Sequence, residues 1–129
     1  TKDVFRNNDS ITSIIIPNSV VKISDGAFWS CKSLTDIVIP DSVTSIGSHA
    51  FWGCYSLKNI QLSNSITEIK DAAFRYCSSL NDVVIPNSVT KIGKFAFEEC
   101  LSLNNIVIPE TTIVDETAFV GCKNLKITK

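Results

Sequence analysis

A 23-residue repeat runs through almost the whole 129-residue chain, and it restricts the possible folds more than any other feature. Each repeat carries an Ala-Phe pair, a cysteine three residues after the Phe, and a leucine three residues after the cysteine. The cysteines are Cys31, Cys54, Cys77, Cys100 and Cys122, and the Ala-Phe pairs begin at Ala27, Ala50, Ala73, Ala96 and Ala118. Prolines keep the same spacing at Pro17, Pro40, Pro86 and Pro109, with Ser63 in the missing place. The last repeat is one residue short between Pro109 and Ala118. A single repeat of this length cannot bury its apolar side chains alone, so the sequence predicts a stack of coils.

One repeat, residues 34–56, shows what each segment is expected to form. Residues 36–39 alternate between outward and inward positions, as in a half-buried strand, and Pro40 ends that strand because it has no N–H to donate. A second apolar column follows, made of Ile23, Ile46, Ile69, Ile92 and Val114. Gly47 and Gly93 are expected to form a turn with positive φ. The Ala-Phe-x-x-Cys motif then predicts one helical turn.

Together these segments predict an α/β repeat, namely a right-handed solenoid of 23-residue repeats with a parallel β-sheet along one face and short helical turns. Each coil is expected to advance by roughly 4.8 Å, the strand spacing of a sheet. Residues 1–129 are expected to form a single domain of about five repeats. Phe5 and Val4 take the Phe and Ala places of an earlier, incomplete repeat, so we expect the chain to be a piece of a longer array.

The repeat pattern L-x-x-I-x-I-P-x-S-V-T-x-I-G-x-x-A-F-x-x-C-x-S-L resembles the BspA-like class of leucine-rich repeats, which occurs in surface proteins of bacteria and protists. Residues 34–51 match it throughout, and the resemblance extends from Val4 to Leu125. The resemblance implies a leucine-rich-repeat solenoid at the cell surface or outside the cell. It also implies attachment to a protein partner, such as a host, neighbouring-cell or matrix protein. The matching positions are core positions, so they do not name that partner.

Composition and motifs argue against several function classes. The net charge is −1, with 12 basic and 13 acidic residues, so the chain lacks the positive excess with which nucleic-acid-binding proteins attract phosphates. No run of 18 apolar residues exists, so no membrane insertion is expected in this segment. The only histidine, His49, occupies a variable place that we expect on the exposed convex side. Because the sequence has no Gly-rich phosphate loop and no paired-carboxylate motif, we expect no enzyme activity, no cofactor and no metal.

The five cysteines admit three interpretations: a metal site, a disulfide framework or a ladder of buried thiols. Metal-binding cysteines are usually separated by about two to four residues, whereas these follow the period of the fold itself. An odd number in one column leaves at least one unpaired. We therefore expect buried thiols. Separately, residues 8–10 (Asn-Asp-Ser) form a glycosylation sequon, whose use depends on the host.

Two surfaces are candidates for partner binding. The first is the outward side of the predicted strands, with Ile15, Asp36, Val38, Asn59, Gln61, Asp82 and Val84. The second is an aromatic patch near the Phe positions, with Trp29, Trp52, Tyr55, Arg75 and Tyr76. Trp, Tyr and Arg dominate the binding energy of protein interfaces. Each surface also has a structural explanation, because β-branched residues favour strands and large side chains could simply cover the turn beneath them.

The leading hypothesis is a non-enzymatic, protein-binding domain of the adhesion type. Two alternatives stay open. A structural spacer array would have its recognition surface elsewhere and would bind nothing in isolation. A carbohydrate-binding surface would use the aromatic patch, and soluble sugars would then change the tryptophan fluorescence.

Overall fold

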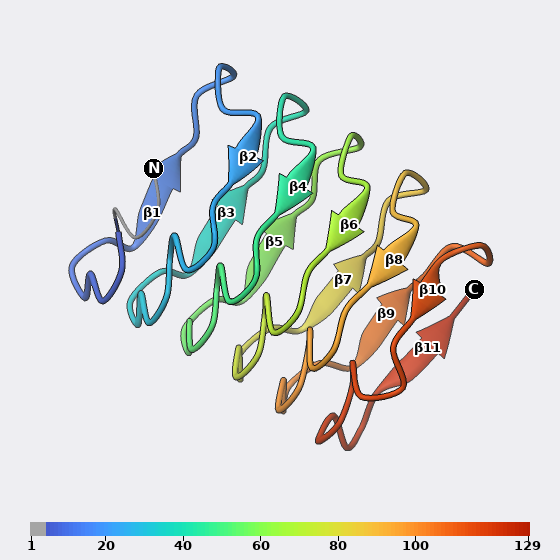
Figure 1. Ribbon diagram of the computed structural model, residues 1–129. Helices are drawn as coiled ribbons and strands as arrows, with labels where there is room; N and C mark the ends of the chain where they lie inside the picture. The colour runs from blue at the N-terminus through green and yellow to red at the C-terminus, as the bar shows by residue number, and fades with distance from the viewer. Residues whose placement is uncertain (1–4) are drawn as a thin grey trace.

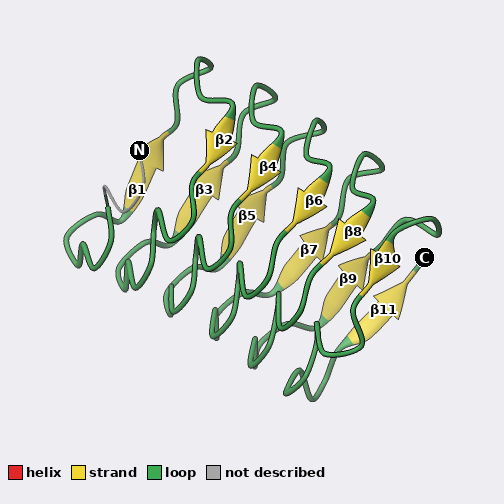
Figure 2. Ribbon diagram, viewed as in Figure 1, coloured by secondary structure: helices red, strands yellow, loops and turns green. Residues whose placement is uncertain are grey.

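The computed structural model describes residues 5–129, so Val4 lies outside the described part. Figure 1 shows successive coils stacked side by side, with the first and last coils at opposite ends, and Figure 2 shows two rows of strands along the stack. One row consists of β1 (Ser13–Ile15), β3 (Asp36–Val38), β5 (Asn59–Gln61), β7 (Asp82–Val84), β9 (Asn105–Val107) and β11 (Lys126–Thr128). The other consists of β2 (Lys22–Ile23), β4 (Ser45–Ile46), β6 (Glu68–Ile69), β8 (Lys91–Ile92) and β10 (Ile113–Val114). The predicted parallel-strand solenoid is confirmed.

Paired strands run parallel and belong to neighbouring coils. Ile14 lies opposite Ile37, and Ile37 lies opposite Ile60. The shorter strands form one five-stranded sheet, whereas the longer strands form two three-stranded sheets, β1-β3-β5 and β7-β9-β11. The single sheet expected on this face is therefore interrupted between β5 and β7. The interruption falls in the coil where Ser63 replaces proline, and there the buried Ser63 Oγ donates a hydrogen bond of 2.8 Å to the carbonyl of Val43.

The predicted helical turn at Ala-Phe-x-x-Cys is wrong, because the described part of the chain contains no helix. Residues 24–31 form consecutive turns instead, and their N–H groups alternate between two kinds of partner. The N–H of Trp29 donates to the carbonyl of Gly26 in the same coil at 3.1 Å, whereas the N–H of Phe28 donates to Ala50 of the next coil at 2.7 Å. A helix satisfies its interior N–H groups within itself. Here alternate N–H groups bind the coils to one another instead.

Two places in this turn region have a positive φ, each at the third residue of a four-residue turn. The first place has φ between 57° and 67° and holds Gly26, His49, Ala72 and Phe95. The second has φ between 56° and 86° and holds Asn7, Ser30, Gly53, Tyr76, Glu99 and Gly121. Most of these residues are not glycine, although the left-handed region costs an ordinary residue about 1–2 kcal/mol. The hydrogen bonds between coils hold them in this conformation.

Gly47 and Gly93, which were expected to need a positive φ, do not have one. The backbone of the preceding coil instead lies so close that a side chain would not fit at either position. A Cβ atom at Gly47 would lie 2.6 Å from the backbone nitrogen of Asp25, and one at Gly93 would lie 2.9 Å from that of Asp71. Glycine is needed at these places because two backbones approach each other, not because of the local conformation.

The core consists of ladders in which the same side chain stacks from coil to coil. The rings of successive core phenylalanines, from Phe5 to Phe119, have centroids 5.1–5.5 Å apart and lie within 12° of parallel. All five cysteines are free thiols, four of them buried and Cys122 half-buried, which confirms the expected thiol ladder. Each thiol donates to a phenylalanine carbonyl, as Cys77 does to Phe51 at 3.1 Å. Burial raises the pKa of the Cys77 thiol, so this thiol stays protonated at neutral pH.

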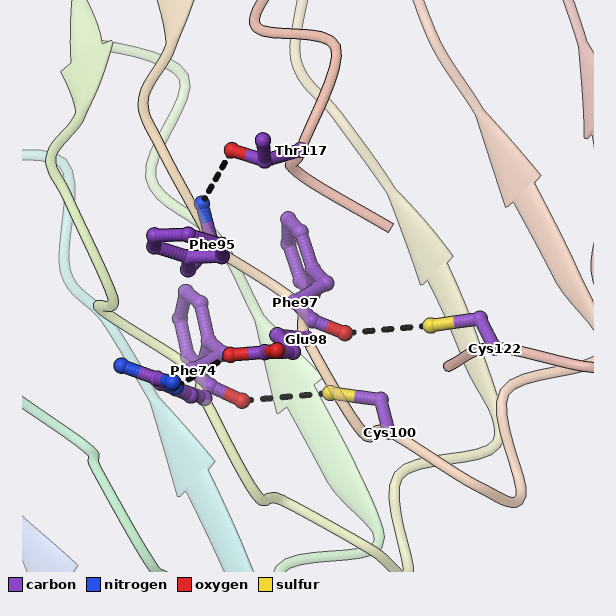
Figure 3. Close-up of polar contacts among 8 residues, drawn as sticks. Phe74, Phe95, Phe97, Glu98, Cys100, Thr117 and Cys122 are labelled. Atoms are coloured by element: carbon purple, nitrogen blue, oxygen red, sulfur yellow. Dashed lines mark hydrogen bonds and ion pairs between the residues drawn. The ribbon is translucent and has the colours of Figure 1, made fainter. Parts of the chain in front are cut away.

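In the shortened last repeat, a side chain takes the place of a backbone hydrogen-bond acceptor. The missing residue lies between Thr112 and Ile113, since Ile113 pairs with Lys91 only 22 residues earlier. Thr117 takes the first positive-φ place of the turn but does not have a positive φ. Its hydroxyl oxygen accepts the N–H of Phe95 at 3.2 Å (Figure 3), where the equivalent N–H groups in earlier coils donate to a backbone carbonyl. One hydroxyl thus restores the link that the deletion removes.

Candidate partner-binding site

The strand face is the surface made by the outward side chains of β1, β3, β5, β7 and β9. In a strand, successive side chains point to opposite sides, so the residues before and after each inward Ile or Val point outward. Within each of the two sheets the register aligns these outward residues, and the repeat continues both columns from one sheet to the next. The polar column is Ser13, Asp36, Asn59, Asp82 and Asn105, and the apolar column is Ile15, Val38, Gln61, Val84 and Val107. All seven strand residues predicted for partner binding lie on this face.

The apolar column leaves large hydrocarbon side chains in water. Ile15 is 93% exposed, Val84 66%, Val38 56% and Val107 42%, and only Gln61 interrupts the series. Strand propensity alone explains a β-branched residue here, but threonine would satisfy it without exposing two methyl groups. The column thus exposes two apolar pairs, Ile15 with Val38 and Val84 with Val107, and grouped exposed apolar side chains mark interaction sites in soluble proteins.

The polar column carries two carboxylates that the following coil holds in place. The amide Nδ2 of Asn59 donates to Asp36 Oδ1 at 2.9 Å, and that of Asn105 donates to Asp82 Oδ1 at 3.1 Å. The hydroxyl of Thr35 donates to Asp36 Oδ2 at 3.0 Å. The hydrogen bonds from Asn59 and Thr35 lower the pKa of Asp36. The strand face thus presents Asp36 as a fixed anion at neutral pH.

Two grooves lie at equivalent places on the strand face. The first, of about 390 Å³, lies between β1 and β3 and is lined by Ile15, Asn18, Asp36, Val38 and Pro40, among others. The second, of about 320 Å³, lies between β5 and β7 and is lined by Gln61, Asn64, Asp82, Val84 and Pro86, among others. Each of these residues in the second groove follows its counterpart in the first by two repeats. The strand face therefore has two grooves at equivalent places, although Gln61 replaces Ile15 in the second and only the first lies across paired strands.

The predicted aromatic patch forms a stacked ridge along the turn edge, here called the aromatic ridge (Arg6, Trp29, Trp52, Arg75 and Tyr76). The indole rings of Trp29 and Trp52 lie 4.8 Å apart, and Tyr76 meets Trp52 edge-on at 5.3 Å. The guanidinium of Arg6 lies 4.5 Å from the centre of the Trp29 ring. Arg6 belongs to the coil before Trp29 and Trp52 to the coil after, so opposite faces of the Trp29 ring are covered. Both tryptophans are half-buried.

His49 and Phe95 extend this ridge, and the sequence prediction missed both. His49 was expected on an exposed convex place, but it is half-buried and its ring stacks on Trp29 at 5.2 Å. The guanidinium of Arg75 lies 4.9 Å from the centre of the Phe95 ring and forms an ion pair with Glu98. The positive φ shared by His49 and Phe95 was the missing signal. Tyr55, also predicted here, is 42% exposed and takes no part in these ring contacts within residues 5–129.

Two further kinds of site are absent from the described part of the chain. Residues 5–129 contain no group of three or more His, Cys, Asp or Glu side chains that could hold a metal ion. Within the same residues no helix is long and apolar enough to cross a bilayer.

The repeat geometry corresponds to one family. The sequence profile of the BspA type leucine-rich repeat region matches residues 1–126 in six copies. The chain belongs to the BspA-type leucine-rich-repeat family. The resemblance seen in the repeat pattern is therefore confirmed over almost the whole chain. A comparison with curated protein sequences gives no match to this BspA-type chain.

Solved structures of bacterial leucine-rich-repeat proteins share this fold. A leucine-rich cell surface protein of Faecalibacterium prausnitzii A2-165 is 38% identical, with a TM-score of 0.88 over 92% of this BspA-type chain and 32% of that protein. A leucine-rich-repeat protein of T. pallidum is 30% identical, with a TM-score of 0.80 over 91% of this chain and 68% of that one. A third, from Bacteroides ovatus, is 36% identical, with a TM-score of 0.78 over 85% of this chain and 29% of that protein. The chain thus spans about a third of two of these proteins. The F. prausnitzii protein is named as a cell surface protein, and none of the three names states a ligand.

Proposed function

We propose that this BspA-type chain is a non-enzymatic, protein-binding domain of a cell-surface or extracellular protein, and that it binds through the strand face. The observation that carries the proposal is the apolar column, whose Ile and Val side chains are 42–93% exposed. Fully burying one such side chain is worth about 1.5–3 kcal/mol, so a partner that covers the column gains affinity from each coil that presents an Ile or Val. The partner class is a host, neighbouring-cell or matrix protein. The F. prausnitzii neighbour, named as a cell surface protein, supports the location.

The polar column gives this surface a means of discrimination. Asp36 and Asp82 are held by asparagines of the following coils, so they are oriented before a partner arrives. Preorganised groups lose less freedom on binding and reject partners that leave them unpaired. The strand face therefore combines apolar contact area with fixed hydrogen-bond acceptors, which suits a protein surface.

The aromatic ridge is the weaker candidate for a ligand. A sugar ring stacks on the open face of an aromatic side chain, but both faces of Trp29 are covered by Arg6 and Trp52. A sugar would have to displace one of these neighbours. The contacts instead support a structural role, in which the ridge stabilises the turn edge. This argues for protein binding on the strand face over carbohydrate binding on the ridge.

Binding to a panel of matrix and cell-surface proteins and glycans tests the proposal. The test variant is Val38→Thr with Val84→Thr, which keeps the branched shape and replaces one methyl group of each valine by a hydroxyl. Its affinity for any protein bound by the wild type should fall at least about tenfold, as expected when two central contacts are lost. The comparison variant Trp52→Phe should bind normally. Loss in Trp52→Phe alone would move the site to the aromatic ridge, and no binding by the wild type would favour the spacer alternative.

A further inference from the structure

Two kinds of aspartate hydrogen bond alternate from one junction between coils to the next. The carboxylate of Asp25 accepts the N–H of Ser48 in the next coil at 2.9 Å, and Asp71 accepts the N–H of Lys94 in the same way at 2.9 Å. These bonds join the coil of β1 to the coil of β3, and the coil of β5 to the coil of β7. On the strand face, bonds from asparagine to Asp36 and Asp82 join the coil of β3 to the coil of β5, and the coil of β7 to the coil of β9. The two kinds of junction alternate, so chemically equivalent places recur every second coil.

The two grooves follow this two-coil period. Both lie at junctions that the asparagine-aspartate bonds do not bridge, and both have an aspartate, a valine and a proline on one wall. Asn18 and Asn64 lie at equivalent places on the opposite walls. The paired strands β1, β3 and β5 are about 4.8 Å apart, so β1 and β5, which each line one of the two grooves, lie about 9.6 Å apart along the solenoid axis. A segment that fills both must present equivalent side chains at that spacing.

Three regular backbone conformations of a bound segment differ in the distance after which they present the same face. A β-strand presents the same face every two residues, or about 6.6 Å. An α-helix returns to the same face after one turn of about 5.4 Å, or two turns of about 10.8 Å. A polyproline II helix has three residues per turn and a rise of about 3.1 Å per residue, so every third residue recurs after about 9.3 Å. The polyproline II repeat differs from the groove spacing by about 0.3 Å, and the other two by more than 1 Å.

The chemistry of the grooves also suits this conformation. The backbone of a polyproline II helix makes no internal hydrogen bonds, so its carbonyls are free to accept from the exposed amides of Asn18 and Asn64. Pro40 and Pro86 offer flat apolar walls beside the exposed valines. One aspartate per groove favours a basic side chain at the same interval.

We infer that the strand face binds a polyproline II segment that runs along the solenoid axis and carries a basic residue at every third position. The inference rests on the proposed function, because it assigns the kind of segment that the proposed surface receives. One basic side chain lies at Asp36 and the next at Asp82. The residues between them pack against Val38, Pro40 and their equivalents two coils later.

Two labelled peptides of equal composition test the inference by fluorescence anisotropy. The in-register peptide is Pro-Pro-Arg-Pro-Pro-Arg-Pro-Pro, and its isomer Pro-Pro-Arg-Pro-Arg-Pro-Pro-Pro has the same charge with the wrong interval. The in-register peptide should bind at least about threefold more tightly, which is the scale of one exposed ion pair. Asp82→Asn should remove this preference. The control Glu110→Gln removes an equal charge outside both grooves and should leave the preference unchanged.

Equal affinity for the two peptides, or a preference that survives Asp82→Asn, would overturn the inference in favour of simple charge attraction. Failure of both peptides to bind would also overturn it. The proposed function is judged separately, by the loss of protein binding in Val38→Thr with Val84→Thr. A protein partner lost in that variant, together with no peptide binding, would leave the strand face as the site and remove only the polyproline II assignment.

Discussion

Replacing Thr117 by valine should weaken the last coil, because the side chain keeps its shape and loses its oxygen. In the wild type, Thr117 Oγ1 accepts the N–H of Phe95 at 3.2 Å and donates to Asp115 Oδ1 at 2.6 Å. A donor left without a partner in a half-buried place costs about 1–3 kcal/mol. Since 1.4 kcal/mol corresponds to a factor of ten, protection of the Phe95 amide against hydrogen exchange should fall about 5- to 150-fold.

Native-state hydrogen exchange is the suitable assay because repeat arrays open locally, coil by coil, rather than all at once. Thr117→Ser keeps the oxygen and should restore most of the protection at Phe95. Thr67→Val is the matched control, since its exposed hydroxyl makes only a long bond of 3.4 Å to Thr44, and exchange at Phe95 should not change. Wild-type protection of Phe95 in Thr117→Val would refute the view that this hydroxyl replaces a backbone link.

Three further outcomes are expected. Titration with a thiol reagent in denaturant should find five thiols, and fewer than five would indicate a disulfide. In the native protein, Cys54 and Cys77 should react only on unfolding because burial raises their pKa. Gly93→Ala should lower the unfolding free energy by about 1–3 kcal/mol in urea titrations, since its Cβ would press on the backbone of the preceding coil, and an unchanged midpoint would contradict this. Hydrogen bonds in the folded state lower the pKa of Asp36. The ionised Asp36 therefore stabilises the folded chain above about pH 4, and this stabilisation is lost as the pH falls through the lowered pKa of the folded state. In Asn59→Ala an NMR titration should find that pKa moved back toward the usual value, and an unmoved pKa would assign the shift to other groups.

The strands and core could be predicted from the sequence because their signals repeat in every coil. Ile37 and its equivalents alternate with outward residues, and five copies of one pattern leave little choice of register. The thiol ladder followed from the same period, since 23-residue spacing suits stacking and not a metal site. The outward strand positions were found by alternation alone.

The turn region could not be predicted because two structures share its spacing. A helical turn and a series of four-residue turns both bring Phe28 and Cys31 together, and only the partner of each N–H group distinguishes them. Glycine was taken as the sign of positive φ, yet Ala72 and Glu99 have it as well. His49 was predicted to be exposed, whereas its side chain is half-buried against Trp29. The grooves were missed because their period is two repeats.

Methyl and indole NMR signals of the chain bound to a protein from the binding panel test the central proposal most directly. If the strand face is the binding site, the methyl signals of Ile15, Val38 and Val84 should shift or broaden on binding. The indole N–H signals of Trp29 and Trp52 should stay in place, because the aromatic ridge then plays no part. Shifts at the two indoles with unchanged strand-face methyls would contradict the account and move the binding site to the turn edge.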